Sequence, residues 1–212
     1  MINCDYILLI LNCKIYEEKA LMQKKTWLSK LPDDLIYFHV IGDIELDQPF
    51  TFDHYNHILK VKTKDDYISL PHKVIDAYNA IKKTYIFKYI FKTDDDQKLI
   101  LPNFFETIKK KLILSREKYY YGGYKMTIHD HVSDYYLQHP ELPQNTKLNE
   151  TVYCTGRFYF LSSEAVDDLL SKSEHIKKEY FEDYAIGYYL DNIYKSNILF
   201  INTLQVFCDF SL

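Results

Sequence analysis

The sequence predicts a single α/β domain, residues 1–212, built on a mainly parallel sheet with helices on both faces. Its length is that of one ordinary domain. Hydrophobic residues make up 47% of the chain and charged residues 26%, which is typical of a globular protein. Strand-like and helix-like stretches alternate along the chain, as they do where crossover helices connect parallel strands.

Short apolar runs mark the predicted strands. The first, residues 6–11, is apolar throughout, as expected of a strand covered on both faces. A second strand, residues 35–41, is closed by Gly42 and Asp43, and residues 58–61 form a weaker third. Further strands are expected at residues 85–91, 119–126 and 154–161, with one or two more within residues 198–207.

Helices are predicted between these strands. The first covers residues 16–31 and ends before Pro32. Ser69 can cap a second helix that runs to about residue 85, with Pro71 in its first turn, where the missing N–H costs nothing. Its apolar residues recur at helical spacing: Val74, Ile75, Tyr78 and Ile81. Other helices are expected at residues 102–114, 163–171 and 182–194, whereas residues 127–150, rich in polar residues and containing two prolines, predict a long functional loop.

Charge and cysteine usage exclude several classes of protein. The chain has 26 basic and 30 acidic residues, which argues against a nucleic-acid binder held by phosphate contacts. No apolar run approaches the ~20 residues of a membrane span. The four cysteines form no C-x-x-C pair, so we expect reduced thiols in a cytoplasmic protein. The cysteines are Cys4, Cys13, Cys154 and Cys208.

Three successive carboxylates follow the strand predicted at residues 85–91, at the end of a strand where ligands bind in parallel sheets. Alternate residues of an extended segment point the same way, so Asp94 and Asp96 can share a face while Asp95 points elsewhere. Their repulsion is relieved by a divalent cation, and carboxylate oxygens suit Mn²⁺ or Mg²⁺. Two carboxylates leave coordination positions open for phosphate oxygens. The alternative is a solvated turn before the Pro102 helix.

Two further segments carry candidate site residues. Glu182 and Asp183 open a predicted helix, where negative charge is favourable in any case, and the functional alternative makes one of them a general base. Gly156 precedes an alternating apolar strand and either permits close approach of a ligand or forms a simple bulge. Arg157, one of only two arginines, offers a planar fork for phosphate or carboxylate.

Five segments, in this order, resemble glycosyltransferase family 31, the β-1,3-galactosyltransferases and N-acetylglucosaminyltransferases that include Fringe-type enzymes. Residues 24–27 (Lys-Lys-Thr-Trp) resemble a basic–Thr–Trp helix end, and residues 66–73 resemble Asp-x-Tyr-x-Asn-Leu-x-x-Lys with Ser69 in place of Asn. Residues 92–96 match Lys-Thr-Asp-Asp-Asp. Residues 155–162 resemble a Gly-containing strand that ends in Ser, and residues 182–187 match Glu-Asp-Val-x-x-Gly with Tyr for Val.

This resemblance implies a GT-A fold, a nucleotide-diphosphate sugar donor, a glycan acceptor and inverting transfer with Mn²⁺ or Mg²⁺. By position, Asp183 is the general base and Asp96 ligates the metal directly. Asp94 and Asp95 hold metal-bound water and the ribose. We therefore expect metal at Asp94 and Asp96. We expect the nucleotide sugar at Asp95, Lys73, Gly156 and Arg157, with Glu182 beside the acceptor or supporting the site.

The sequence also departs from the family. Members usually follow an N-terminal membrane anchor, whereas the first strand here begins near residue 6, so the domain is either alone or one part of a longer protein. The family's late metal-binding His has no counterpart after His175, which leaves Asp209 or water. Three alternatives stay open: a retaining GT-A transferase, a non-catalytic sugar-binding module of this fold and a nucleotidyltransferase.

Overall fold

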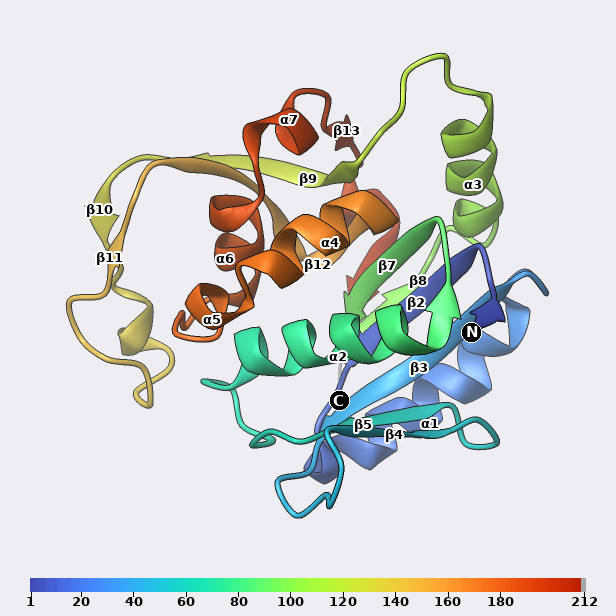
Figure 1. The fold of residues 1–212 in the computed structure, drawn as a ribbon, viewed down its shortest axis with the longest axis horizontal. Coiled ribbons are helices and arrows are strands. Elements are labelled where there is room, and N and C mark those ends of the chain that lie inside the picture. The colour runs from blue at the N-terminus through green and yellow to red at the C-terminus, as the bar shows by residue number, and fades with distance from the viewer. Residues whose placement is uncertain (211–212) are drawn as a thin grey trace.

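A computed structural model describes residues 1–210, which form a mixed eight-stranded sheet in the order β13-β9-β12-β7-β2-β3-β5-β4 (Figure 1). The pairs β13–β9, β7–β2, β2–β3 and β3–β5 are parallel, and the other three are antiparallel. The strands are β2 (Tyr6–Leu11), β3 (Leu35–Gly42), β4 (Phe50–Asp53), β5 (Ile58–Val61), β7 (Tyr89–Asp94), β9 (Tyr121–Ile128), β12 (Thr151–Ser162) and β13 (Leu199–Phe200). The predicted α/β class is confirmed.

Strand β2 shows why helices cover both faces of the sheet. All six of its residues are buried, and alternate side chains enter two separate hydrophobic cores. Ile7, Leu9 and Leu11 pack in one core with α2 (Leu70–Thr84), α4 (Ser163–Ser171) and α6 (Glu182–Tyr189). Tyr6, Leu8 and Ile10 pack in the other with α3 (Phe104–Leu114) and with Trp27, which follows α1 (Glu17–Thr26). Figure 1 shows α2 and α4 in front of the sheet.

Several strands and helices begin or end at residues other than those predicted from the sequence. The strand expected at residues 85–91 is two pieces, β6 (Tyr85–Ile86), which pairs with β1 (Ile2–Asn3), and β7, which pairs with β2 as far as Asp94. The helix expected over residues 16–31 ends at Thr26 and continues as a 3₁₀ turn, η2 (Leu28–Lys30). The helix expected over residues 182–194 is divided into α6 and α7 (Asn192–Lys195), with the short α5 (Ser173–Ile176) before them.

Short strands beyond the sheet were not predicted from the sequence. β8 (Gln97–Leu99) pairs with β14 (Phe207–Asp209) next to the acidic triplet. Within the expected loop at residues 127–150, β10 (His131–Val132) pairs with β11 (Lys147–Leu148). This hairpin projects to one side of the sheet in Figure 1. Among the helices of residues 1–210, none has the length and apolar character needed to cross a bilayer.

Candidate active site

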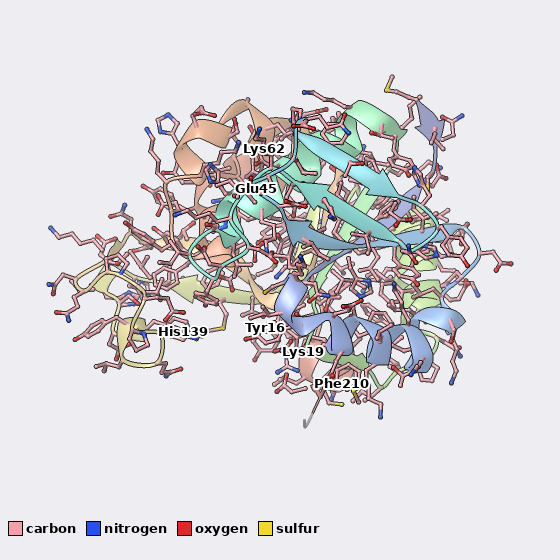
Figure 2. The ribbon with its side chains drawn as sticks, turned by 90° about the horizontal axis from the view of Figure 1, so that it is seen from below. Tyr16, Lys19, Glu45, Lys62, His139 and Phe210 are labelled. Atoms are coloured by element: carbon pink, nitrogen blue, oxygen red, sulfur yellow. The ribbon has the colours of Figure 1, made fainter. Side chains whose placement is uncertain are left out.

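A cleft of about 1120 Å³ opens at the carboxyl ends of β2 and β7. Its floor includes the acidic triplet, residues 94–96, and its walls come from the start of α1, the loop after β5, the loop around β10 and β11, and the start of α6. Figure 2 shows two of these walls, with Tyr16 and Lys19 at the start of α1 and His139 in the projecting loop. The cleft therefore lies where ligands bind in open α/β sheets.

The acidic triplet separates its three carboxylates. Asp94 is the last residue of β7, and it and Asp96 line the cleft half-buried. Asp95 is buried and forms an ion pair with Lys19 of α1 at 3.4 Å. The lysine ammonium also lies 4.0 Å from the centre of the Tyr16 ring. The arrangement agrees with the alternation expected of an extended segment.

The Asp94 and Asp95 carboxylates bind protons more tightly than usual. Burial raises the pKa of Asp94 to about 6, with the Glu182 carboxylate adding to the rise and Lys92 partly offsetting it. Burial likewise raises the pKa of Asp95 to about 6, against the effect of Lys19. The carboxylates of residues 94–96 and of Asp183 line the same cleft, and a bound cation would relieve their mutual repulsion.

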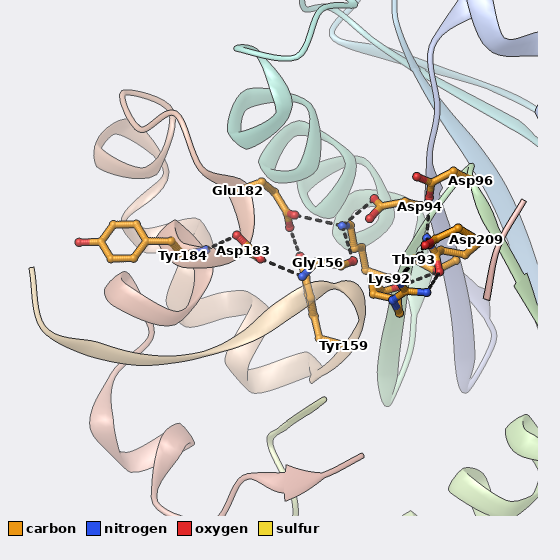
Figure 3. A network of polar contacts seen from close by, with 12 residues as sticks. Lys92, Thr93, Asp94, Asp96, Gly156, Tyr159, Glu182, Asp183, Tyr184 and Asp209 are labelled. Carbon is orange, nitrogen blue, oxygen red and sulfur yellow. Dashed lines mark hydrogen bonds and ion pairs between the residues drawn. The ribbon is translucent and has the colours of Figure 1, made fainter. Parts of the chain in front are cut away.

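Lys92 of β7 organises the polar network that lines the cleft beside the acidic triplet (Figure 3). Its ammonium lies 2.8 Å from Asp94 Oδ1 and 3.1 Å from Glu182 Oε2, and it donates to the carbonyl oxygen of Gly156 at 2.8 Å. Burial lowers the pKa of Lys92, but Asp94 and Glu182 outweigh this and the net shift is upward. A buried, charged lysine thus joins the triplet to the start of α6.

Glu182 does more than favour the start of a helix. Its side chain is buried and accepts a hydrogen bond from the Tyr159 hydroxyl, which lies 2.8 Å from that of Tyr78. Burial raises the pKa of Glu182, while Lys92 lowers it. The carboxylate oxygens of Glu182 are therefore engaged by Lys92 and Tyr159.

Asp183 faces the triplet across Gly156. Its Oδ2 accepts from the Gly156 amide and its Oδ1 from the Tyr184 amide, both at 2.8 Å. A Cβ added at Gly156 would lie 3.5 Å from Asp183 Oδ2 and 3.7 Å from Asp94 Oδ2. Burial raises the pKa of Asp183, with Lys92 opposing. The two carboxylates therefore converge on one small space, which the absence of a side chain at residue 156 keeps open.

Arg157 is held away from the space beside Gly156. It donates to Gln97 Oε1 at 2.8 Å and lies 3.0 Å from Asp209 Oδ1. Gln97 in turn donates to Asp96 Oδ1 at 2.7 Å and to Asp209 Oδ1 at 2.8 Å. The sequence suggested Arg157 for phosphate, but its guanidinium pairs with the C-terminal strand, and Asp209 is brought beside Asp96.

Lys73 was expected beside the nucleotide. Its side chain is fully buried, lies 2.6 Å from Asp65 Oδ1 and donates to the Asn12 carbonyl at 2.8 Å. Asp65 also accepts from the amides of Gly42 and Lys14. Lys73 therefore fixes the loops at the carboxyl ends of β2, β3 and β5, and only Asp65 and Asn12 of this group line the cleft.

The residues present fit a divalent cation that takes some of its ligands from the protein and the rest from a bound substrate. Asp94 and Asp96 supply hard oxygen atoms at the cleft surface. Within residues 1–210, His, Cys, Asp and Glu side chains form no group of three or more able to hold a metal ion by themselves, and this includes His129, Asp130 and His131. A cation here would need phosphate oxygens or water to complete its coordination.

Sequence reasoning missed Lys92 as a site residue. The signal was present, because a lysine inside the apolar run of residues 89–93 can be buried only if it is paired. It also missed Tyr159 and Gln97, whose roles depend on contacts across 23 and 112 positions of the chain. No local pattern marks such contacts.

The model of the galactosyltransferase family matches residues 21–197, most of the chain. The chain belongs to that family. Family membership makes it a glycosyltransferase, with a sugar donor and an acceptor as its substrates. No match was found among curated proteins.

Solved glycosyltransferase structures resemble this family member at low sequence identity. A glycosyltransferase involved in glycosylation of the major capsid of PBCV-1 is 13% identical, with a TM-score of 0.49, over 93% of this chain and 82% of that one. The galactosyltransferase LgtC, solved with donor and acceptor sugar analogs, is 10% identical, with a TM-score of 0.46, over 93% and 73%. GlyE of Streptococcus pneumoniae TIGR4 is 10% identical, with a TM-score of 0.45, over 94% and 46%.

Proposed function

We propose that this glycosyltransferase transfers a sugar from a UDP-sugar to a hydroxyl of a glycan acceptor, with inversion and with Mn²⁺ or Mg²⁺ bound at Asp94 and Asp96. One observation carries the proposal: Asp183 from the start of α6 and Asp94 from the floor of the cleft converge on the space beside Gly156. The resemblance to family 31 suggests the uridine nucleotide and the inversion. A cation bound there would neutralise the charge that develops on the departing diphosphate.

Each residue then has a defined task. Asp183 receives the proton of the acceptor hydroxyl, and its two amide hydrogen bonds hold the carboxylate in one orientation. Its raised pKa makes it a stronger base than a free aspartate. Lys92 and Glu182 keep Asp94 in place from below. A single base is sufficient for one displacement, and no covalent intermediate is required.

Donor binding tests the metal part of the proposal. We expect calorimetry to show UDP binding that needs Mn²⁺, and Asp96→Asn to weaken this binding about tenfold or more, since one charged ligand is worth at least about 1.4 kcal/mol. Asp167→Asn is the matched control, because Asp167 pairs with Lys82 of α2 outside the cleft residues. Equal UDP affinity with and without Mn²⁺ would contradict the proposal.

Transfer kinetics test the base. We expect Asp183→Asn to keep UDP binding and to lose about 10²–10⁴ in transfer rate, because an amide cannot take up the proton. Glu182→Gln should chiefly lower the melting temperature, since it weakens a buried pair with Lys92. Near wild-type transfer by Asp183→Asn would remove this residue from the mechanism. Retention of anomeric configuration in the product would favour the retaining alternative.

A further inference from the structure

Side chains on one face of α1 contact the acidic triplet and Gln97, the residue that follows it. Lys19, Gln23 and Trp27 are spaced four residues apart, so their side chains leave the helix and its C-terminal end on the same side. Lys19 pairs with the Asp95 carboxylate, and the Trp27 indole N–H donates to the Gln97 carbonyl at 3.1 Å. The middle residue makes the most extensive contact.

Gln23 joins the two ends of this turn. Its amide nitrogen donates to the carbonyl oxygen of Asp94 at 3.0 Å and to that of Gln97 at 2.9 Å. The side chain is completely buried. Both donor hydrogens of the amide are therefore used to fix the distance across residues 94–97, the segment that carries Asp94 and Asp96.

The orientation of the Gln23 amide is itself fixed by β3. Its Oε1 lies 3.0 Å from Nε2 of His39, which is also buried. An amide oxygen can only accept, so His39 must donate from Nε2. A flipped amide would place its oxygen against two carbonyl oxygens, neither of which can donate, so the amide nitrogen must face the turn and the amide oxygen must face His39. The arrangement admits one orientation only.

We propose that Gln23, oriented by His39, is the positioning residue that sets the separation of the Asp94 and Asp96 carboxylates for the divalent cation of the donor complex. The inference rests on the proposed function. Gln23 touches neither metal nor donor, and acts through the main chain of the turn. A buried glutamine that only filled space between α1 and the sheet would not need both of its donors on the same four-residue turn.

Metal titration separates positioning from packing. Gln23→Met keeps length and burial but removes both donors and the acceptor for His39. Ile81→Val, in the buried face of α2, provides a matched destabilised control. For each protein we would measure the melting temperature and the Mn²⁺ concentration that gives half-maximal UDP binding. We expect Gln23→Met to raise that Mn²⁺ concentration about tenfold or more, and Ile81→Val to leave it unchanged.

A second pair of variants keeps the test decisive if Gln23→Met does not fold. His39→Gln retains a nitrogen donor for the Gln23 oxygen and should preserve the Mn²⁺ requirement, whereas His39→Leu removes the donor and should raise it. A lower melting temperature with an unchanged Mn²⁺ requirement in Gln23→Met, or in His39→Leu, would overturn the inference. Absence of Mn²⁺-dependent UDP binding in the unmodified protein would instead overturn the proposed function, and the inference with it.

Discussion

Gly156 lies where the charged groups of the cleft converge. A methyl group at this position would be 3.4 Å from the Lys92 ammonium and 3.5 Å from Asp183 Oδ2, which are contacts that the fold tolerates. We expect Gly156→Ala to melt within a few degrees of the unmodified protein but to lose about 10- to 100-fold in transfer rate, because the added group occupies the space between the carboxylates. Melting curves and initial rates check this.

Gly187 of α6 provides the control substitution for Gly156→Ala. A Cβ there would lie 2.2 Å from the Tyr153 Cβ and 2.6 Å from its Cα, a contact with β12 that requires the helix to move. Gly187→Ala should therefore be destabilised, by about 1–3 kcal/mol. If Gly156→Ala instead showed the larger drop in melting temperature with normal transfer, Gly156 would be a packing position.

At the scale of single residues, the sequence predicted which side chains line the cleft better than it predicted their ion-pair partners. Asp94, Asp96 and Asp183 line one cleft, as their positions at a strand end and a helix start suggested. Lys73 and Arg157 were expected at the nucleotide sugar; in the structure Lys73 pairs with Asp65, and Arg157 pairs with Asp209, 52 positions along the chain. Local spacing carries no record of which opposite charge will be brought alongside.

His139 provides one of the attachments between the loop around β10 and β11 and the rest of the cleft. Its imidazole stacks on the Tyr67 ring at 4.3 Å and 9°, and on the Tyr135 ring of its own loop at 4.8 Å. Tyr67 belongs to the loop after β5, so the stack joins two walls of the cleft. Contacts of this kind contribute about 0.5–1.5 kcal/mol each.

We expect His139→Ala to loosen this loop while leaving the sheet intact. Limited proteolysis should cut residues 133–147 several times faster than in the unmodified protein, since local opening governs cleavage. His129→Ala is the control, because His129 lies in the same loop and its exposed contact with Glu150 contributes little. Equal cleavage rates in the two variants would show that the stack does not hold the loop.

Inner strands of the central sheet were predictable because burial on two faces leaves a continuous apolar run, as in β2, whereas the edge strand β4, none of whose residues is fully buried, was not predicted. The short strands were not predicted either. β8 and β14 are three residues each, and each exists only because the other pairs with it. β7 also extends beyond its predicted end, because pairing with β2 carries it to Asp94 despite the charge.

The stability of the whole molecule should depend on pH through His39. Burial lowers the pKa of this histidine to about 3, with Lys24 and His57 acting in the same direction. In the unfolded chain it titrates near 6.5. The stabilising effect of keeping His39 neutral is therefore complete above about pH 6.5, and is lost as the pH falls from there toward 3, because only the unfolded chain takes up the proton.

The raised pKa values of Asp94 and Asp95 have the opposite effect on the free energy of unfolding, since protonation of these carboxylates favours the folded state as the pH falls through about 6. The variant His39→Gln retains both aspartates, so subtracting its free energy of unfolding removes their contribution. We expect the free energy of unfolding of the unmodified protein, relative to that variant, to fall by about 2 kcal/mol between about pH 7.5 and 5. Urea titrations at both pH values measure it, and a constant difference would contradict a neutral buried His39.

The pairing of β14 with β8 has a consequence for synthesis. Gln97 meets Asp209 across 112 positions, so the acidic triplet leaves the ribosome long before the strand that lies beside it. Contacts between distant parts of a chain form late, after the intervening segment has been ordered. Until residue 209 emerges, Arg157 has no carboxylate from that strand and Asp96 no second neighbour through Gln97. We therefore expect that a nascent chain cannot carry a complete donor site until residue 209 has left the ribosome.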